Sequence, residues 1–194
     1  MGGTCEITLS TEKVVQLVYG AQHPGSGTVY LQSVRMRKVD EQSGVALCYR
    51  SLLSNNAGRL AALVRDQVPE IDAVVSPPSS RQDAVPYREA ILRDRPGTPD
   101  LSGDFTRAGK TKAGDSKTTV KDMVDEFQYR SVKDLSGVKS LLIVDESIST
   151  GKTVAAVLQH LYANGLPEDC RITVAVWAKL SPRTKATPAE GAKG

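Results

Sequence analysis

Residues 140–161 decide the fold of this chain and read SLLIVDESISTGKTVAAVLQHL. Four apolar residues lead into two adjacent carboxylates, Asp145 and Glu146. A short loop of Ser, Thr and Gly residues follows, and then an amphipathic run of helical periodicity. A continuous apolar run bounded by polar residues is typical of a strand that is buried on both faces. The stretch therefore predicts a buried strand, a polar loop and a helix in direct succession.

The same order of elements recurs on both sides of this stretch. IDAVV (71–75) predicts a buried strand that ends in the polar loop SPPSSR, and a helix is expected over 83–94. RITVAVWAKL (171–180) predicts a last buried strand, and VKDMVDEFQYRS (120–131) a short helix that leads into an extended piece. Repeated strand, loop and helix units are typical of an α/β fold with a mainly parallel central sheet flanked by helices.

The region before the first of these units has a different pattern. Alternating apolar and polar residues over 28–39 and 44–53, separated by the polar turn DEQSG, predict two antiparallel strands of a β-hairpin. Asn55 or Asn56 is then expected to cap a helix over 57–68. The hairpin would stand as an appendage to the α/β core.

Length and composition restrict the function classes. A chain of 194 residues is the size of one domain, and its net charge of +3 is too small to indicate a nucleic-acid partner by itself. The three cysteines form no CxxC pair, which argues against a zinc knuckle or a disulfide framework and favours a reducing cytoplasm. No apolar run reaches the length of a membrane span. We expect a cytoplasmic protein without a membrane partner.

The STGKT sequence suggests the phosphate loop of an ATPase, but the spacing argues against it. A Walker A loop has the pattern GxxxxGK[ST], and its first glycine lets the backbone wrap around the phosphates. Counting back from Gly151, that position is occupied by Glu146, whose carboxylate would repel a phosphate. A nucleotide-triphosphate site of the Walker type is therefore disfavoured.

The same residues suit a sugar phosphate better. Two neighbouring carboxylates at a strand end accept hydrogen bonds from vicinal hydroxyls or hold the waters of a magnesium ion. The loop that follows offers hydroxyls and backbone N–H groups at a helix N-terminus, which is a site for a monophosphate. A diol at one end and a phosphate at the other describe a ribose 5-phosphate. The competing structural interpretation, a capped helix after a buried strand, explains the threonines and one carboxylate only.

LLIVDESISTGKT (141–153) closely resembles the thirteen-residue phosphoribosyl pyrophosphate signature of type I phosphoribosyltransferases. The resemblance implies that Asp145 and Glu146, the acidic pair, hold the ribose hydroxyls and lie in the second coordination shell of Mg²⁺. It also implies a 5-phosphate loop, called the phosphate loop below, that consists of Ser147, Ile148, Ser149, Thr150, Gly151, Lys152 and Thr153.

The resemblance extends to two further segments. An earlier strand of the family ends in a pyrophosphate-binding loop, and the matching residues here are Ser76, Ser79, Ser80 and Arg81. A long basic loop closes over the active site in the family, and residues 106–119 occupy its place, with Arg107, Lys110 or Lys112 as the expected anchor. Such closure would neutralise the diphosphate and exclude water from an oxocarbenium-like transition state, so Arg107 and Lys110 join the acidic pair as predicted catalytic residues. A solvated linker is the alternative for this segment.

The layout from residue 57 to residue 180 is most similar to the ComF-like branch of the family, although the four-cysteine zinc module of that branch is missing. The resemblance implies a single domain over 1–178, with a core at 56–178 and an N-terminal region at 1–55 whose hairpin serves as a hood over the acceptor. Residues 179–194 are expected to form a flexible tail.

The acceptor is not readable from the sequence. Hypoxanthine-guanine enzymes have an aspartate just before T-G-K-T, and Ser149 stands there, so a 6-oxopurine is less favoured and no general base is identified. The resemblance predicts a phosphoribosyltransferase that uses Mg²⁺ and phosphoribosyl pyrophosphate, with a nitrogen acceptor, most simply a nucleobase. The alternatives are a non-catalytic sensor of that sugar diphosphate and, ranked last, a nucleic-acid-binding module that uses the basic loop and tail. The sequence is compatible with a homodimer but does not determine the oligomeric state.

Overall fold

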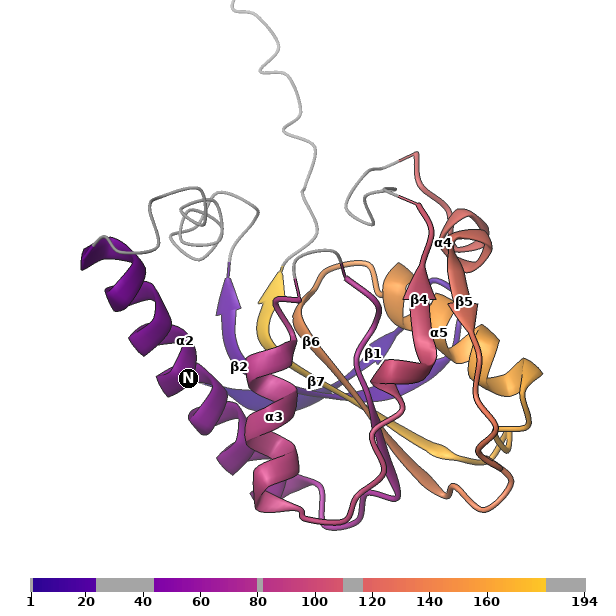
Figure 1. The fold of residues 1–194 in the computed structure, drawn as a ribbon, viewed down its shortest axis with the longest axis horizontal. Coiled ribbons are helices and arrows are strands. Elements are labelled where there is room, and N and C mark those ends of the chain that lie inside the picture. The colour runs from indigo at the N-terminus through magenta and orange to yellow at the C-terminus, as the bar shows by residue number, and fades with distance from the viewer. Residues whose placement is uncertain (1, 24–43, 80–81, 110–116, 181–194) are drawn as a thin grey trace, which may run out of the picture.

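The computed structural model describes residues 2–23, 44–79, 82–109 and 117–180. Its centre is a five-stranded sheet in the order β1-β2-β7-β6-β3, in which only the β1–β2 pair is antiparallel (Figure 1). The strands of this sheet are β1 (Gly3–Thr8), β2 (Val14–His23), β3 (Ala73–Val75), β6 (Ser140–Ile148) and β7 (Arg171–Leu180). The carboxyl ends of the four parallel strands therefore meet at one edge, the upper edge in Figure 1.

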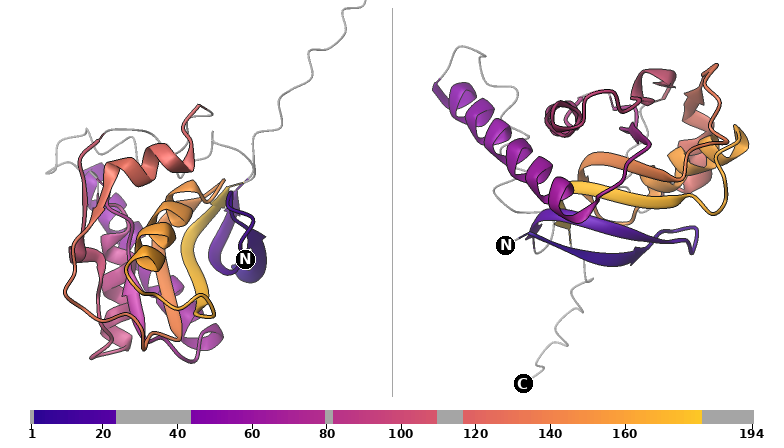
Figure 2. Two further views of the ribbon diagram at one scale, coloured as in Figure 1. Left: turned by 90° about the vertical axis from the view of Figure 1, so that its right-hand side faces the viewer. Right: turned by 90° about the horizontal axis from the view of Figure 1, so that it is seen from below.

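Helices cover both faces of the sheet, which gives three layers (Figure 2). One face carries α2 (Gly44–Gln67) and α3 (Val85–Asp94). The opposite face carries α5 (Lys152–Ala163), α4 (Val120–Glu126) and a small antiparallel sheet of β4 (Phe105–Arg107) and β5 (Phe127–Tyr129), with the short 3₁₀ helix η2 (Ser102–Asp104) before β4. The predicted α/β fold, with a mainly parallel sheet and flanking helices, is confirmed, and the structure has an N-terminal β-hairpin, although at other residues than predicted.

The apolar run of β6 is explained by its central position. Side chains alternate between faces along a strand, so Leu141 and Ile143 pack into the core beneath α5, whereas Leu142 and Val144 pack into the core beneath α2 and α3. All four side chains are fully buried. Their burial ends at Asp145, where β6 reaches the open edge of the sheet.

The predicted hairpin over 28–53 is wrong in its second strand. Residues 44–53 are the first turns of α2, and residues 28–39 lie outside the described part of the chain. Leu53, Ala57, Leu60 and Val64 recur every three or four residues and pack against the sheet, so one helix continues through the predicted caps. Asn55 and Asn56 accordingly lie inside α2.

The actual hairpin is formed by β1 and β2, which the sequence analysis had not identified. Cys5, Ile7 and Leu17 point toward the core on the α5 side, and a turn with Glu12 in the left-handed region (φ 64°) joins the strands. The alternation of inward Cys5 and Ile7 with outward Thr4, Glu6 and Thr8 was available in the sequence. Because β2 pairs with β7, the hairpin belongs to the main sheet instead of standing apart from it.

Two smaller points complete the fold. β7 runs to Leu180, two residues beyond the predicted end of the domain, and residues 181–194 of the predicted tail are outside the described part. Among the described helices, none combines the length and the apolar character that crossing a bilayer requires.

Candidate functional site

The acidic pair lies at the carboxyl end of β6. Asp145 still pairs with Val176 of β7, so its backbone is held within the sheet, and Glu146 follows it directly as a partly exposed residue. The backbone N–H of Glu146 donates a hydrogen bond to Oδ1 of Asp145 at 2.8 Å. The sheet therefore fixes both carboxylates next to each other at the edge where α/β proteins bind ligands.

The electrostatic environment of Asp145 favours its protonated form. Burial raises its pKa well above the ordinary value of 3.8, and the neighbouring charge of Glu146, together with a hydrogen bond between the two side chains, adds to the effect. The charge of Asp83, a buried residue just ahead of α3, acts in the same direction. A ligand that brings hydroxyl donors or a cation to Asp145 would favour the ionised form instead.

The phosphate loop turns sharply from β6 into α5. Ser149 and Thr150 are exposed, and Gly151 has a φ of 70°, in the left-handed region that glycine adopts at little cost. A Cβ at Gly151 would also lie 2.7 Å from Cδ2 of Leu9, so the loop packs closely against the β1–β2 hairpin. Beyond the turn, α5 begins at Lys152, and a helix N-terminus presents backbone N–H groups and a partial positive charge that suit an anion.

The other predicted members of the phosphate loop have different surroundings. The Lys152 ammonium donates to the backbone carbonyl of Thr118 at 2.6 Å, just before α4. The Thr153 hydroxyl lies 3.8 Å from the sulfur of Met123 in α4. Ile148 is nearly buried, and Ser147 pairs with Ala178 of β7. The structure therefore brings all seven residues to one place, with Ser149 and Thr150 exposed to the solvent.

The loop that follows β3 runs next to the acidic pair, because β3 is the neighbour of β6 in the sheet. Ser76 is 4% exposed, and its backbone N–H donates to the Ser102 hydroxyl at 2.7 Å. Its own hydroxyl is buried without a hydrogen-bond partner in the described part of the chain. Ser79 is partly exposed, whereas Ser80 and Arg81 lie outside the described residues.

The predicted anchors of the basic loop are only partly described. Lys110 and Lys112 lie outside the described residues. Arg107 ends β4 and forms a two-point ion pair with Glu126, with both its Nε and its Nη2 3.0 Å from Oε2. Both side chains are less than one fifth exposed. Its guanidinium also lies 5.7 Å from the ring centre of Phe127, so Arg107 is held at the base of the basic segment.

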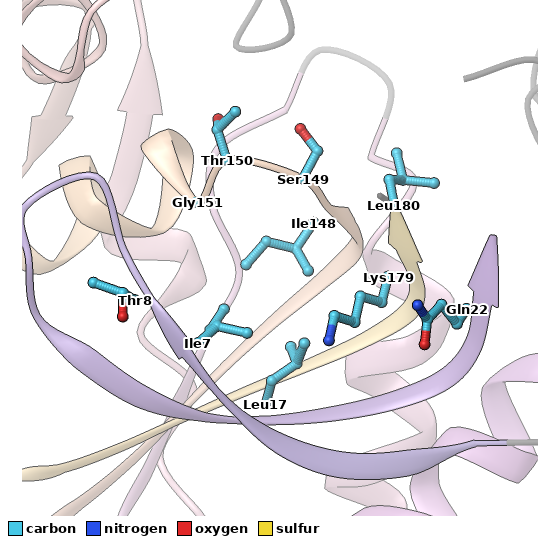
Figure 3. A pocket seen from close by; sticks show the side chains of 10 residues that line it. All are labelled: Ile7, Thr8, Leu17, Gln22, Ile148, Ser149, Thr150, Gly151, Lys179 and Leu180. Atoms are coloured by element: carbon cyan, nitrogen blue, oxygen red, sulfur yellow. The ribbon is translucent and has the colours of Figure 1, made fainter. Parts of the chain in front are cut away.

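A pocket of about 350 Å³ opens beside the phosphate loop, between the β1–β2 hairpin and the end of β7 (Figure 3). Its lining comes from all three elements and consists of Ile7, Thr8, Leu17, Gln22, Ile148, Ser149, Thr150, Gly151, Lys179 and Leu180. The lining combines apolar and polar side chains, which suits a small ligand with an apolar body and a few polar groups.

Lys179 gives this pocket a positive charge. Its Nζ lies 3.2 Å from Sγ of Cys5 and 5.4 Å from the ring centre of Tyr19. No carboxylate among the described residues pairs with it. Gln22 is the direct cross-strand neighbour of Lys179. The pocket residues of β1, β2 and β7 were not predicted from the sequence, because the hairpin was expected at 28–53 and residue 179 was assigned to the tail.

The described residues provide two adjacent carboxylates for a cation and no group of three or more His, Cys, Asp or Glu side chains that could enclose a metal ion. This arrangement fits a magnesium ion that takes most of its ligands from a bound diphosphate and from water, since Mg²⁺ dehydrates reluctantly. It does not fit a zinc site made of protein ligands alone.

Comparisons with known proteins give structural similarities only. No family model matches the sequence, and no curated protein matches it. A purine phosphoribosyltransferase from Pyrococcus horikoshii is 16% identical and aligns over 68% of this chain and 84% of its own, with a TM-score of 0.43. A hypoxanthine phosphoribosyltransferase from Staphylococcus aureus, also 16% identical, aligns over 66% of this chain and 62% of its own, with a TM-score of 0.37. At this identity and these scores, the similarity extends no further than the general arrangement of helices and strands.

Proposed function

We propose that the protein binds phosphoribosyl pyrophosphate together with Mg²⁺ and transfers its phosphoribosyl group to a nitrogen acceptor, with release of pyrophosphate. One observation carries this proposal. The acidic pair is fixed at the end of β6, and the left-handed turn at Gly151 leads directly from it to the N-terminus of α5. A site that suits a diol and a site that suits a monophosphate therefore follow each other directly in the chain.

Each part of the donor has a group that suits it. The carboxylates of Asp145 and Glu146 accept hydrogen bonds from the two ribose hydroxyls, and their negative charge favours the nearby magnesium ion. The hydroxyls of Ser149 and Thr150 and the N–H groups at the start of α5 receive the 5-phosphate. The Ser76 hydroxyl, which has no hydrogen-bond partner among the described residues and lies on the loop beside β6, would donate to the pyrophosphate.

The pocket beside the phosphate loop is proposed as the acceptor site. Ile7, Leu17 and Ile148 supply apolar surface for a heterocycle, while Gln22 and Lys179 supply polar groups at its edge. In the reaction, a nitrogen lone pair of the acceptor forms a bond to C1 of the ribose as the bond from C1 to the pyrophosphate oxygen breaks. The pyrophosphate leaves with the electron pair, and Mg²⁺ offsets its charge when bound.

Titration calorimetry tests the donor site. We expect the wild-type protein to bind phosphoribosyl pyrophosphate in the presence of Mg²⁺, and the double variant Asp145→Asn with Glu146→Gln to lose this binding. The control, Glu70→Gln, removes an exposed carboxylate at the opposite, amino-terminal end of β6 and should bind as the wild type does. Unchanged affinity in the double variant would refute the assignment of the donor site.

An acceptor screen tests the reaction itself. Pyrophosphate release is measured with a panel of nucleobases in the presence of the sugar diphosphate and Mg²⁺. Release with one acceptor establishes the transferase. Tight binding of the donor without release for any acceptor would favour the sensor alternative, in which the same site regulates a partner.

A further inference from the structure

Lys152 lies in the phosphate loop, yet its charged end is committed to another part of the molecule. Its Nζ donates to the carbonyl oxygen of Thr118 at 2.6 Å, and the bond is partly buried. Thr118 is 7% exposed and immediately precedes Thr119, the N-cap of α4. The contact therefore joins the start of α5 to the start of α4, across 34 residues of sequence.

The position of Lys152 within α5 does not by itself favour a positively charged side chain. It is the first residue of α5, where the aligned peptide dipoles place a partial positive charge. A cation is disfavoured there, because it meets a partial charge of the same sign. The bond to a buried carbonyl offsets this cost, because hydrogen bonds from charged donors are stronger than neutral ones.

Helix α4 depends on such outside contacts. It has only seven residues, which is too short for a helix to be stable alone in water. A capping box between Thr119 and Asp122 supports its first turn. Contacts from α5 hold the rest of it, since His160 Nε2 lies 3.0 Å from the carbonyl oxygen of Val124 and Met123 is buried against the core.

The position of α4 in turn determines that of Arg107. The last residue of α4 is Glu126, which holds Arg107 by the two-point ion pair, and the backbone N–H of Ala108 donates to the carbonyl of Glu126 at 2.9 Å. A connected path of contacts therefore leads from the phosphate loop through Lys152 and α4 to Arg107, the arginine at the base of the basic segment.

We propose that Lys152 is a positioning residue that couples the phosphate loop to α4 and thereby to Arg107. This proposal rests on the proposed function, because the ligand whose binding it transmits is the sugar diphosphate. Lys152 acts through the carbonyl of Thr118, and the 5-phosphate is held by the hydroxyls and N–H groups of the loop. Binding of the 5-phosphate reduces the motion of the phosphate loop. The hydrogen bond from Lys152 to Thr118 then reduces the motion of α4 as well.

Hydrogen exchange of the α4 amides tests the coupling. In the ligand-free protein, Lys152→Met should accelerate exchange over residues 120–126 about tenfold, the effect of losing one charge-assisted hydrogen bond. Lys152→Arg, which keeps a donor, should restore the slow rate. Lys121→Met is the matched control, because it removes an exposed lysine of α4 and should exchange as the wild type does.

The same experiment with ligand separates positioning from a purely structural role. Adding phosphoribosyl pyrophosphate and Mg²⁺ should slow α4 exchange further in the wild type and leave it unchanged in Lys152→Met. If the ligand slows exchange equally in both proteins, or if Lys152→Met exchanges as the wild type does without ligand, the coupling is refuted. Failure of the wild type to bind the sugar in calorimetry would instead overturn the proposed function, while the ligand-free comparison would still decide whether Lys152 holds α4.

Discussion

The protonation of Asp145 should have a measurable effect on the stability of the folded protein. Its pKa is raised in the folded protein, first by burial and then by Glu146, so the folded state binds this proton more tightly than the unfolded chain does. Stability then falls as the pH rises from the unfolded value near 3.8 through the folded pKa. Above that range the ionised carboxylate destabilises the ligand-free fold by a constant amount.

We therefore expect Asp145→Asn to raise the thermal midpoint of the ligand-free protein at neutral pH, although it impairs ligand binding. Asparagine keeps the oxygen that accepts from Glu146 and removes the charge. The difference in thermal midpoint between the variant and the wild type should shrink to zero as the pH approaches 3.8. Thermal denaturation at a series of pH values measures this difference.

Asp134 is the matched control with the opposite sign. Hydrogen bonds from the Ser136 backbone and hydroxyl lower its pKa, so its stabilising effect is present above the unfolded pKa and is lost as the pH falls through the folded one. Asp134→Asn should lower the thermal midpoint slightly at neutral pH. A lower midpoint for Asp145→Asn at neutral pH would contradict the electrostatic description of the acidic pair.

At the scale of single elements, the β1–β2 hairpin depends on one close contact with β7. Gly20 lies opposite Trp177 in the sheet, and a Cβ at this position would overlap the indole ring. Trp177 is 8% exposed and belongs to the core beneath α2, so it has little room to move. The glycine is required because the ring packs directly on the strand backbone.

We expect Gly20→Ala to lower the free energy of unfolding by about 1–3 kcal/mol, the usual cost of inserting atoms into a packed core. Gly58→Ala is the control. Gly58 is exposed inside α2 with open space around it, and alanine should stabilise this helix by about 0.5–1 kcal/mol. Urea denaturation of both variants measures these changes. Equal stability of Gly20→Ala and the wild type would show that β2 and Trp177 separate without cost.

The elements differ in how well the sequence predicted them. β6, α5 and β7 follow from runs of residues whose periodicity is local, and the loop between β6 and α5 was placed correctly because its two neighbours were unambiguous. Residues 44–53 were misread because their alternation also satisfies a helical spacing once the helix continues to residue 67. The packing of the later turns of α2, from Leu53 to Val64, against the sheet decides between the two, and such packing is not a local property.

At the scale of the whole molecule, the pocket beside the phosphate loop is a property of the assembled fold. Thr8 comes from β1, the loop from the end of β6, and Lys179 from β7. We expect Ile7→Trp, at the inward-facing residue of β1 in the lining, to fill the pocket and to abolish turnover of the acceptor while leaving binding of the sugar diphosphate unchanged. Thr4→Trp, at an exposed position of the same strand outside the pocket lining, should keep both activities.

Calorimetry with the donor and turnover with the acceptor found in the screen measure these two effects separately. If Ile7→Trp abolishes donor binding as well, the pocket holds part of the sugar diphosphate, and the acceptor must bind elsewhere. Normal turnover in this variant would show that the pocket is not used in the reaction.

The sequence by itself determined the succession of strand, acidic pair, loop and helix, because hydrophobic periodicity and the chemistry of neighbouring residues act over a few positions. Only the tertiary structure decided which segment packs against the phosphate loop. It also decided that Lys152 donates a hydrogen bond to Thr118 and that Lys179 lines a pocket beside Gln22. These contacts join residues that are 34 to 157 positions apart in the chain. Their formation depends on how the layers pack around the sheet, which no local pattern records.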